Sequence, residues 1–199
     1  MNFDFKKDPI ENFLMAYSEV QKKGVPDAHA MSLASVDPIT LKPSNRIVYY
    51  KGMIDRGLSF YTNYHGRKGL ELEKNKNVCA NFFWTHVDQQ VRFDGFVEKL
   101  TDAQSDSYFQ SRPRLSQIGA WTSLQSQNLK SFDEFHQRFS EFETKYQGKK
   151  VPRPPHWGGF RIVPLEVEFW FGRAGRLHER YVYTRSAENS EWQRSLRFP

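Results

Sequence analysis

The feature that most restricts the fold of this chain is a succession of strand-like segments with helical segments inserted between them. Alternating or continuous apolar runs predict strands at 30–36, 46–51, 58–63, 78–84, 89–100, 159–163, 165–171, 177–184 and 192–197. A parallel α/β sheet requires strands and helices to alternate, and here they do not. We therefore expect a mainly β protein, an antiparallel barrel with peripheral helices.

Three longer helices are expected at the periphery, over about 8–23, 101–118 and 131–146, and a short one over 67–75. Asp8 is followed by a proline, which is typical of an N-cap and the first helical position. Thr101 with Gln104, and Ser131 with Glu134, have the spacing of a capping box. No repeat or long linker divides the chain, so we expect one domain over 1–199.

The third helix carries an aromatic stripe at helical spacing. Its members are Phe132, Phe135, Phe139, Phe142 and Tyr146. Such a stripe is much more common in core packing than in a binding surface, so we expect it to be buried.

The composition indicates what kinds of partner suit the chain. Its 29 Lys and Arg against 23 Asp and Glu give a net charge of +6, which favours anionic partners. The single cysteine, Cys79, cannot form an internal disulfide and lies in an apolar run, where a buried, inert thiol is expected. No apolar run has the length of a signal peptide core or a membrane span, so we expect a cytoplasmic protein without membrane association.

Several common chemistries have no motif here. The sequence lacks a G-x-x-x-x-G-K-[ST] loop, a G-x-G-x-x-G after a strand and a G-x-S-x-G elbow. Its six histidines lack the spacing of metal ligands, so no metal site is expected.

Near the C-terminus, Arg176, His178 and Arg180 occur at every second position. In a strand this period directs all three side chains to one face. Like charges so placed repel, so the face is either solvated or opposite an anion. These residues alone leave both interpretations open.

Two other places gather phosphate-binding side chains. Arg67 and Lys68 open the short helix, whose free N–H groups favour an anion, although a solvated pair explains them equally well. Tyr108 and Arg112 are four residues apart and share a helical face, with Arg114, Ser116 and Gln117 following. Arginine and hydroxyl groups suit phosphate recognition, but they could also only organise the helix end.

The segment 46–51 directs Arg46, Val48 and Tyr50 to one strand face and ends at Lys51. A half-buried strand with a polar end explains this pattern as well as a binding site does.

Taken together, these segments resemble the pyridoxine/pyridoxamine 5′-phosphate oxidase family, FMN enzymes of vitamin B6 metabolism. The resemblance rests on motifs in family order from about Asp8 to the C-terminus: "RIVYYK", "FYTNYHGRK", "QQVRFDG", "YFQSRPRLSQIGAW", "QSQ", "PPHWGGFRI", "EFWFGR" and "RLHER". It implies a homodimeric FMN-binding split barrel with the flavin at the subunit interface, some residues of each site coming from the second subunit.

The resemblance also implies the site residues. The cofactor would be held by Arg46, Ile47, Val48, Tyr49, Tyr50, Lys51, Tyr61, Thr62, Arg67, Lys68, Gln90, Gln125, Ser126, Trp170 and Arg180. The substrate phosphate would be held by Lys51, Tyr108, Arg112 and Ser116. Arg176 and His178 would face the pyridine ring as catalytic residues, and Asp27 matches an acidic position near the substrate. The cations of "RLHER" would then have an anionic partner.

The reaction that the resemblance implies is hydride transfer from C4′ of pyridoxamine or pyridoxine 5′-phosphate to FMN. The product is pyridoxal 5′-phosphate, and dioxygen is reduced to hydrogen peroxide. The alternatives are a related flavin or deazaflavin oxidoreductase with another substrate, and a non-catalytic binder of FMN or pyridoxal phosphate. A nucleic-acid-binding barrel is not expected, because the arginine-rich motifs fall at family site positions.

One departure from the family pattern concerns the N-terminus. Family members usually carry a basic, aromatic segment there that helps to cover the active site, and Phe3, Phe5, Lys6 and Lys7 do not match it. Closure of a lid over the site is therefore an open question from the sequence.

Overall fold

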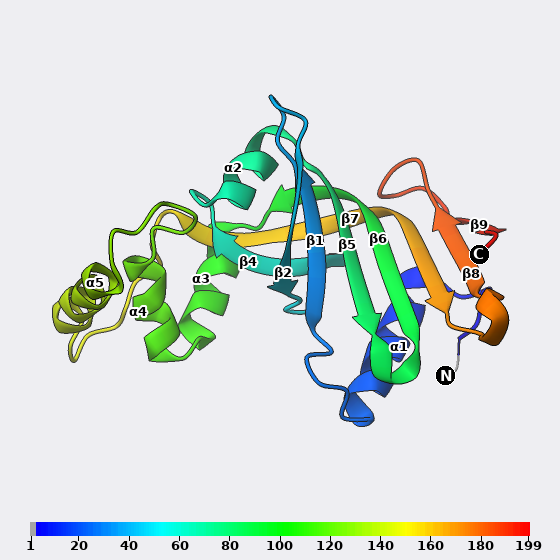
Figure 1. The fold of residues 1–199 in the computed structure, drawn as a ribbon, viewed down its shortest axis with the longest axis horizontal. Helices are drawn as coiled ribbons and strands as arrows, with labels where there is room; N and C mark the ends of the chain where they lie inside the picture. Colours follow the sequence, from blue (N-terminus) through cyan, green and yellow to red (C-terminus); the bar gives the residue numbers. More distant parts are fainter. Residues whose placement is uncertain (1–2) are drawn as a thin grey trace.

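The computed structural model describes residues 3–199 and confirms a mainly β, antiparallel architecture with peripheral helices (Figure 1). The helices are α1 (Pro9–Lys22), α2 (Arg67–Lys74), α3 (Asp102–Ser111), α4 (Arg114–Thr122) and α5 (Phe132–Lys145), with 3-10 turns at Thr85–Val87 and Ala174–Arg176. The strands are β1 (Ala30–Val36), β2 (Pro43–Tyr49), β3 (Met53–Ile54), β4 (Gly57–Asn63), β5 (Asn77–Trp84), β6 (Gln89–Lys99), β7 (Trp157–Phe171), β8 (Glu179–Thr184) and β9 (Gln193–Leu196).

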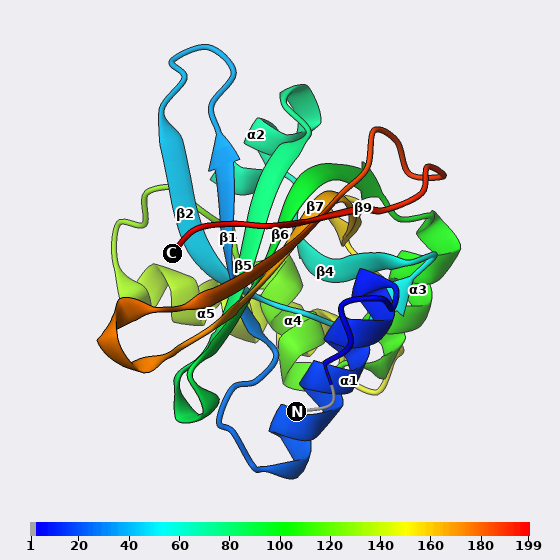
Figure 2. The same cartoon turned by 90° about the vertical axis from the view of Figure 1, so that its right-hand side faces the viewer.

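The sheet divides at β7. Its strand order is β2-β1-β5-β6-β7-β4-β3, and β8 and β9 branch from β7 outside this path. One edge of β7 pairs with β4 over 157–162 and with β8 over 166–171, while the other edge pairs with β6. The expected strands 159–163 and 165–171 are therefore one continuous strand that serves two branches of the sheet. Figure 2 shows how strongly the sheet is curled and twisted.

The branch point follows from Gly95 and Pro164, which are opposite each other where the β6–β7 register shifts. A Cβ on Gly95 would lie 2.0 Å from the carbonyl oxygen of Val163, so only glycine allows the two backbones to approach this closely. Proline has no N–H group to continue the ladder, and a bulge is one of the few places where a strand accepts it.

The main core fills the space between the curled sheet and α1. Asp8 caps α1 by accepting from the backbone N–H of Ile10 at 2.8 Å, with Pro9 at the start of the helix, as predicted. Phe13 is fully buried, and its ring packs against Phe82 and Phe93 with centroids 5.0 Å away. The helix thereby closes one end of the sheet and leaves the other end free for α3, α4 and α5 (Figure 1).

Residues 3–7 lie along β7 and β8. The Phe3 ring is 5.0 Å from that of Phe169 and 4.9 Å from that of Tyr181, and the carbonyl of Phe5 accepts from the Tyr183 hydroxyl at 3.2 Å. In this structure the segment therefore packs at the end of the molecule away from α3 and α4, and does not form a cover there.

Helices α3, α4 and α5 share a second, smaller core. It contains Phe109, Ile118, Ala120, Tyr146, Val151 and Trp157. The prediction of a buried stripe on α5 is wrong for its first turn, because Phe132 is 76% exposed. The later part of the stripe packs against the second core: Phe139 and Phe142 are partly buried and Tyr146 is buried.

Two local predictions need correction. The region 101–118 is two helices, because Arg112 before Pro113 is extended (ψ 148°), as steric contact with a proline ring requires. The strand expected over 177–184 begins only at Glu179, and Gly175 and Arg176 both have positive φ (67° and 62°). Arg176 and His178 therefore precede the strand and do not share a strand face with Arg180.

No helix within residues 3–199 is both long enough and apolar enough to cross a membrane.

Candidate active site

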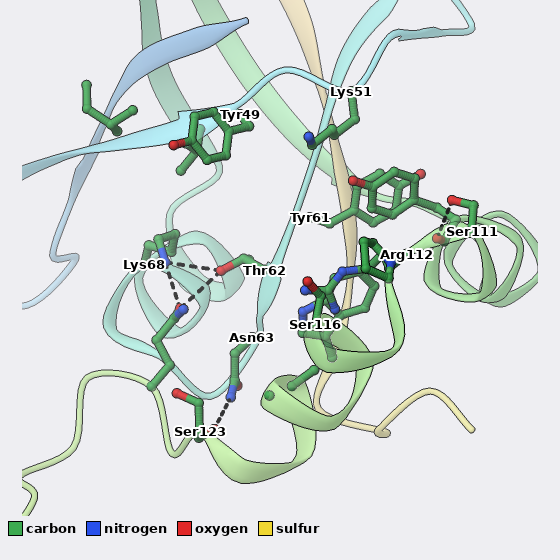
Figure 3. A pocket seen from close by; sticks show the side chains of 18 residues that line it. Tyr49, Lys51, Tyr61, Thr62, Asn63, Lys68, Ser111, Arg112, Ser116 and Ser123 are labelled. Atoms are coloured by element: carbon green, nitrogen blue, oxygen red, sulfur yellow. Dashed lines mark hydrogen bonds between the residues drawn. The ribbon is translucent and has the colours of Figure 1, made fainter. Parts of the chain in front are cut away.

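A cavity of about 720 Å³ lies between the end of β2, the last residues of β4, the start of α2 and helices α3 and α4 (Figure 3). Its size is within the range of small-molecule sites. Three cations line it, Lys51, Lys68 and Arg112, and no carboxylate is among the described residues of its wall. An anionic ligand would therefore meet attraction without an opposing charge.

The first cationic corner is built by Lys68 at the start of α2. Its ammonium group donates to the Thr62 hydroxyl at 3.1 Å and to the Gln125 side-chain oxygen at 2.7 Å. Burial, with the charge of Arg46 adding to it, lowers the pKa of Lys68. The group is a desolvated cation whose present partners are neutral, which is the condition for strong binding of an anion.

The second corner is built by Arg112, at the junction of α3 and α4. Its guanidinium lies 4.6 Å from the Trp157 ring, and its Nη1 is buried without a hydrogen-bond partner among the described residues. Burial lowers the pKa of Arg112. Lys51 and Ser116 line the same part of the cavity (Figure 3). A buried N–H without a partner is costly, so this corner is built to receive an acceptor.

Aromatic rings form the wall next to this corner. Tyr61 stacks on Tyr108 with centroids 3.8 Å apart, and both rings are nearly parallel to that of Trp157. Burial raises the pKa of both tyrosines, so they stay protonated and can donate hydrogen bonds. The cavity thus combines flat apolar surface with two separate cationic ends.

Strand β2 contributes three successive residues to the cavity wall, from both of its faces. Ile47 and Tyr49 are exposed on the outer face and line the cavity together with Val48. The strand expected over 46–51 ends at Tyr49, and two other predicted residues point elsewhere: Arg46, on β2, donates to Glu71 and the Leu33 carbonyl, and the ring of Tyr50, just after β2, is buried in the main core.

Arg67 is also outside the cavity wall, with its Nε donating to Glu71 at 2.8 Å. Ser126 lines a neighbouring hollow beside α5, and Asp27 lies in the turn between α1 and β1, so neither lines this cavity in one chain. The cavity therefore gathers only part of the predicted site residues, and Arg67, Ser126 and Asp27 lie outside its wall.

The remaining predicted residues form a second group near β8. This part of the molecule lies at the opposite end of the long axis from α3 and α4 (Figure 1). Gln90, Trp170 and Arg180 are direct neighbours in register across β6, β7 and β8. Arg180 is held by the buried Glu168 through a bidentate pair, with its Nη2 at 2.8 and 3.0 Å from the two carboxylate oxygens. Within one chain the predicted site residues thus form two separate groups, and only the first contributes to the cavity wall.

His178 and Arg176 belong to this second group. The His178 ring lies 4.6 Å from that of Trp170, and its Nδ1 accepts from the backbone N–H of Arg173 at 3.1 Å. That hydrogen bond places the ring proton on Nε2, which is then free to donate. Arg176 has a left-handed backbone in the preceding turn, a conformation that is unfavourable for a residue with a side chain and is often found at functional sites.

Some wall residues were not predicted. Trp157, Asn63, Ser111 and Ser123 all line the cavity. Trp157 lies in "PPHWGG", where nothing in the local pattern indicates that its ring supports Arg112. Within residues 3–199 no group of His, Cys, Asp and Glu is arranged to hold a metal ion.

Two family models match this chain. Residues 18–146 match the model described as pyridoxamine 5′-phosphate oxidase. Residues 157–199, which include Trp170, Arg176, His178 and Arg180 of the second group, match the model described as the pyridoxine 5′-phosphate oxidase C-terminal dimerisation region.

Individual proteins agree with these matches. A pyridoxine/pyridoxamine 5′-phosphate oxidase of Bdellovibrio bacteriovorus is 49% identical over 197 residues, which cover 99% of this chain and 100% of that protein. The crystal structure of PhzG from Burkholderia lata, in complex with tetrahydrophenazine-1-carboxylic acid, is 26% identical with a TM-score of 0.90 and covers 96% of this chain and 93% of that one. A pyridoxamine 5′-phosphate oxidase-related, FMN-binding protein of Nostoc punctiforme shares the fold, with a TM-score of 0.75, 15% identity and coverage of 98% and 100%.

Proposed function

The chain belongs to the pyridoxamine 5′-phosphate oxidase family, and from this we propose that it oxidises pyridoxamine and pyridoxine 5′-phosphates to pyridoxal 5′-phosphate with FMN as cofactor. The observation that carries the proposal is the cavity with two cationic corners and no carboxylate among its described wall residues. Two phosphate groups, one on the cofactor and one on the substrate, would each find a corner.

The lining of the cavity fits FMN. Lys68, with Thr62 and Gln125 beside it, would hold the FMN phosphate, and the β2 segment from Ile47 to Tyr49 would lie along the ring system. Bound FMN would accept a hydride from the substrate carbon and pass the electrons to dioxygen, giving hydrogen peroxide.

The second corner would hold the substrate phosphate. Arg112 offers a buried N–H without a partner, and Lys51, Tyr108 and Ser116 add further donors around the same space. Binding the phosphate there would fix the distance of the reacting carbon from the flavin, which is a positioning effect. The stacked Tyr61 and Tyr108 would exclude water from one side.

The site would be completed by a second copy of the chain. Gln90, Trp170 and Arg180 lie too far from the cavity of their own chain to contribute to it, yet they lie on a region that matches a dimerisation model or pairs with it. In a twofold homodimer each copy would add this group to the cavity of the other. Arg180 would then place its charge beside the cofactor.

The catalytic pair would act from the second copy as well. Because the Nδ1 atom of His178 already accepts from the Arg173 backbone, its Nε2–H would donate to the substrate and would not act as a base in this arrangement. Arg176 would lie over the pyridine ring and fix its orientation.

The direct test uses the visible absorption of the purified protein. We expect a flavin spectrum with about one FMN per chain, and loss of the visible absorption of the oxidised flavin when pyridoxamine 5′-phosphate is added without oxygen. A bound flavin that keeps its absorption would indicate a binder and contradict the oxidase.

Subunit sharing is tested by mixing two inactive variants, Arg112→Ala and Arg180→Ala, under conditions in which subunits exchange. If each site uses both chains, mixed dimers regain one intact site, and random association restores about a quarter of the intact sites of the unsubstituted protein. A mixture as inactive as its components would contradict the shared site.

The structural similarity to PhzG favours one alternative, a flavin oxidoreductase of the same fold with a different substrate. Lys51 and Arg112 could also hold a carboxylate, the group in the compound bound to PhzG. Comparing flavin reduction by pyridoxamine 5′-phosphate, by unphosphorylated pyridoxamine and by a cyclic carboxylic acid separates the two. The oxidase reacts with the first compound far faster than with the others.

A further inference from the structure

A buried carboxylate lies beside the first cationic corner and has no role in the function proposed above. Glu71, on α2, is 3% exposed. One of its oxygens accepts from Ser35 at 2.5 Å, Ser44 at 2.7 Å and Arg46 at 3.2 Å, and the other accepts from Arg67 at 2.8 Å. Both oxygens are therefore fully used, with donors from β1, β2 and α2.

The two arginines differ in how much they depend on this carboxylate. Arg46 also donates to the Leu33 carbonyl at 3.1 Å and to two serine hydroxyls. For Arg67, the ion pair with Glu71 is the contact that orients a side chain that is otherwise 58% exposed. Without Glu71, Arg67 is expected to sample many rotamers, whereas Arg46 keeps part of its network.

Lys68 is the third cation around the same carboxylate. Burial and Arg46 lower the pKa of Lys68, and the charge of Glu71 opposes that shift. Three cations surround one carboxylate, so the cluster keeps a positive excess for a phosphate while the repulsion between its members is reduced.

We propose that Glu71 is a positioning residue for the phosphate end of the cofactor: it anchors Arg67 through its Nε, with Arg46 fixed on the other carboxylate oxygen, so that the Nη groups of Arg67 are in place beside Lys68 when FMN binds. This inference rests on the proposed function. It predicts an effect opposite in sign to simple electrostatics, because removing a carboxylate near a phosphate site would otherwise strengthen binding of the anion.

The same helix offers a matched control. Glu73 has the same charge, two residues further along α2, but its side chain is 59% exposed, and the one ion pair it makes within residues 3–199, with Lys99, is 3.7 Å long. Glu73→Gln removes the same charge from the same helix without removing any oriented arginine.

The experiment measures the dissociation constants of FMN and of riboflavin, by quenching of flavin fluorescence, for Glu71→Gln, Glu73→Gln and the unsubstituted protein. Riboflavin lacks the phosphate and reports on the rest of the site. We expect Glu71→Gln to weaken FMN at least about tenfold with little change for riboflavin, the scale of one charge-assisted hydrogen bond. Glu73→Gln should leave the ratio of the two constants unchanged.

Three results would overturn the inference. Tighter FMN binding by Glu71→Gln would mean that the carboxylate only opposes the phosphate. An equal loss for FMN and riboflavin would mean that Glu71 maintains the fold. Absence of FMN binding by the unsubstituted protein would overturn the proposed function as well.

If Glu71→Gln does not fold, Arg67→Gln and the milder Glu71→Asp allow the same decision. Arg67→Gln should reproduce the selective loss of FMN. Glu71→Asp keeps the charge but shortens the reach, so it should also weaken FMN selectively. Unchanged FMN affinity in both variants would overturn the inference.

Discussion

Arg112→Ala should remove recognition of the substrate phosphate while leaving the fold almost unaffected. The buried Nη1 of Arg112 has no hydrogen-bond partner among the described residues, so at least one N–H group is available to the ligand. A hydrogen bond to a charged group contributes about 1.5–3 kcal/mol, or roughly 10- to 200-fold. One to two such bonds place the expected loss in kcat/KM for pyridoxamine 5′-phosphate at about two to three powers of ten.

The effect on stability should be small because two contributions oppose each other. A buried donor without a partner costs about 1–3 kcal/mol in the ligand-free protein, and its removal returns that energy. The contact of the guanidinium with Trp157, at 4.6 Å, contributes about 0.5–2 kcal/mol and is lost. The midpoints of these two ranges, about 2 and about 1.2 kcal/mol, nearly cancel, so the net change should be about 1 kcal/mol or less, or within about 4 °C in Tm for a chain of this length.

The assay measures kcat/KM for pyridoxamine 5′-phosphate and for unphosphorylated pyridoxamine on both proteins, with Tm measured without ligand. Arg112→Lys is the matched variant, since it keeps the charge but loses the planar stack and the paired N–H groups. It should fall between the other two proteins. If Arg112→Ala slows both substrates by the same factor, or lowers Tm by much more than 4 °C, Arg112 supports the fold and does not recognise the phosphate.

Three further predictions concern the cofactor corner and the fold. Burial lowers the pKa of Lys68, and only the protonated form attracts a phosphate, so FMN affinity should fall as pH rises through that lowered pKa. Lys68→Arg should abolish this loss of FMN affinity at high pH, and the affinity for riboflavin should stay constant over the same pH range. Gly95→Ala should lower the free energy of unfolding in urea by about 1–3 kcal/mol, because its Cβ would lie 2.0 Å from a backbone oxygen. Gly119→Ala, where a Cβ would meet open space, should be neutral or stabilising. Equal urea midpoints for the two variants would contradict the role of Gly95. Asp8→Ala should cost about 0.5–2 kcal/mol, since α1 loses its N-cap; an unchanged Tm would show that the cap contributes nothing.

The sequence alone was sufficient wherever a structure depends on residues a few positions apart. The N-caps of α1, α3 and α5 are formed by Asp8, Thr101 and Ser131, as their spacing predicts. The 30–36 segment is β1 to the residue, because alternation of apolar and polar side chains reports directly which face of a strand is buried. The ordered motifs of the sequence also indicated the family and its fold.

The spacing of side chains led to a wrong prediction of secondary structure where the backbone adopts a rare conformation. The period-two spacing of Arg176, His178 and Arg180 implied one strand face, but a left-handed turn at Gly175 and Arg176 precedes the strand. Side-chain spacing does not report φ, so the pattern could not distinguish a strand from a turn.

Only the tertiary structure decided which residues meet. Lys68 reaches Gln125, 57 positions away, and Arg112 lies over Trp157, from the start of β7. Glu71 joins residues of three elements, a role that no property of its neighbours in sequence indicates. Such contacts depend on how β7 divides the sheet and where α2 and α3 then pack. The separation of the cavity from Arg180 has the same origin, because one sheet places them at opposite ends of the chain.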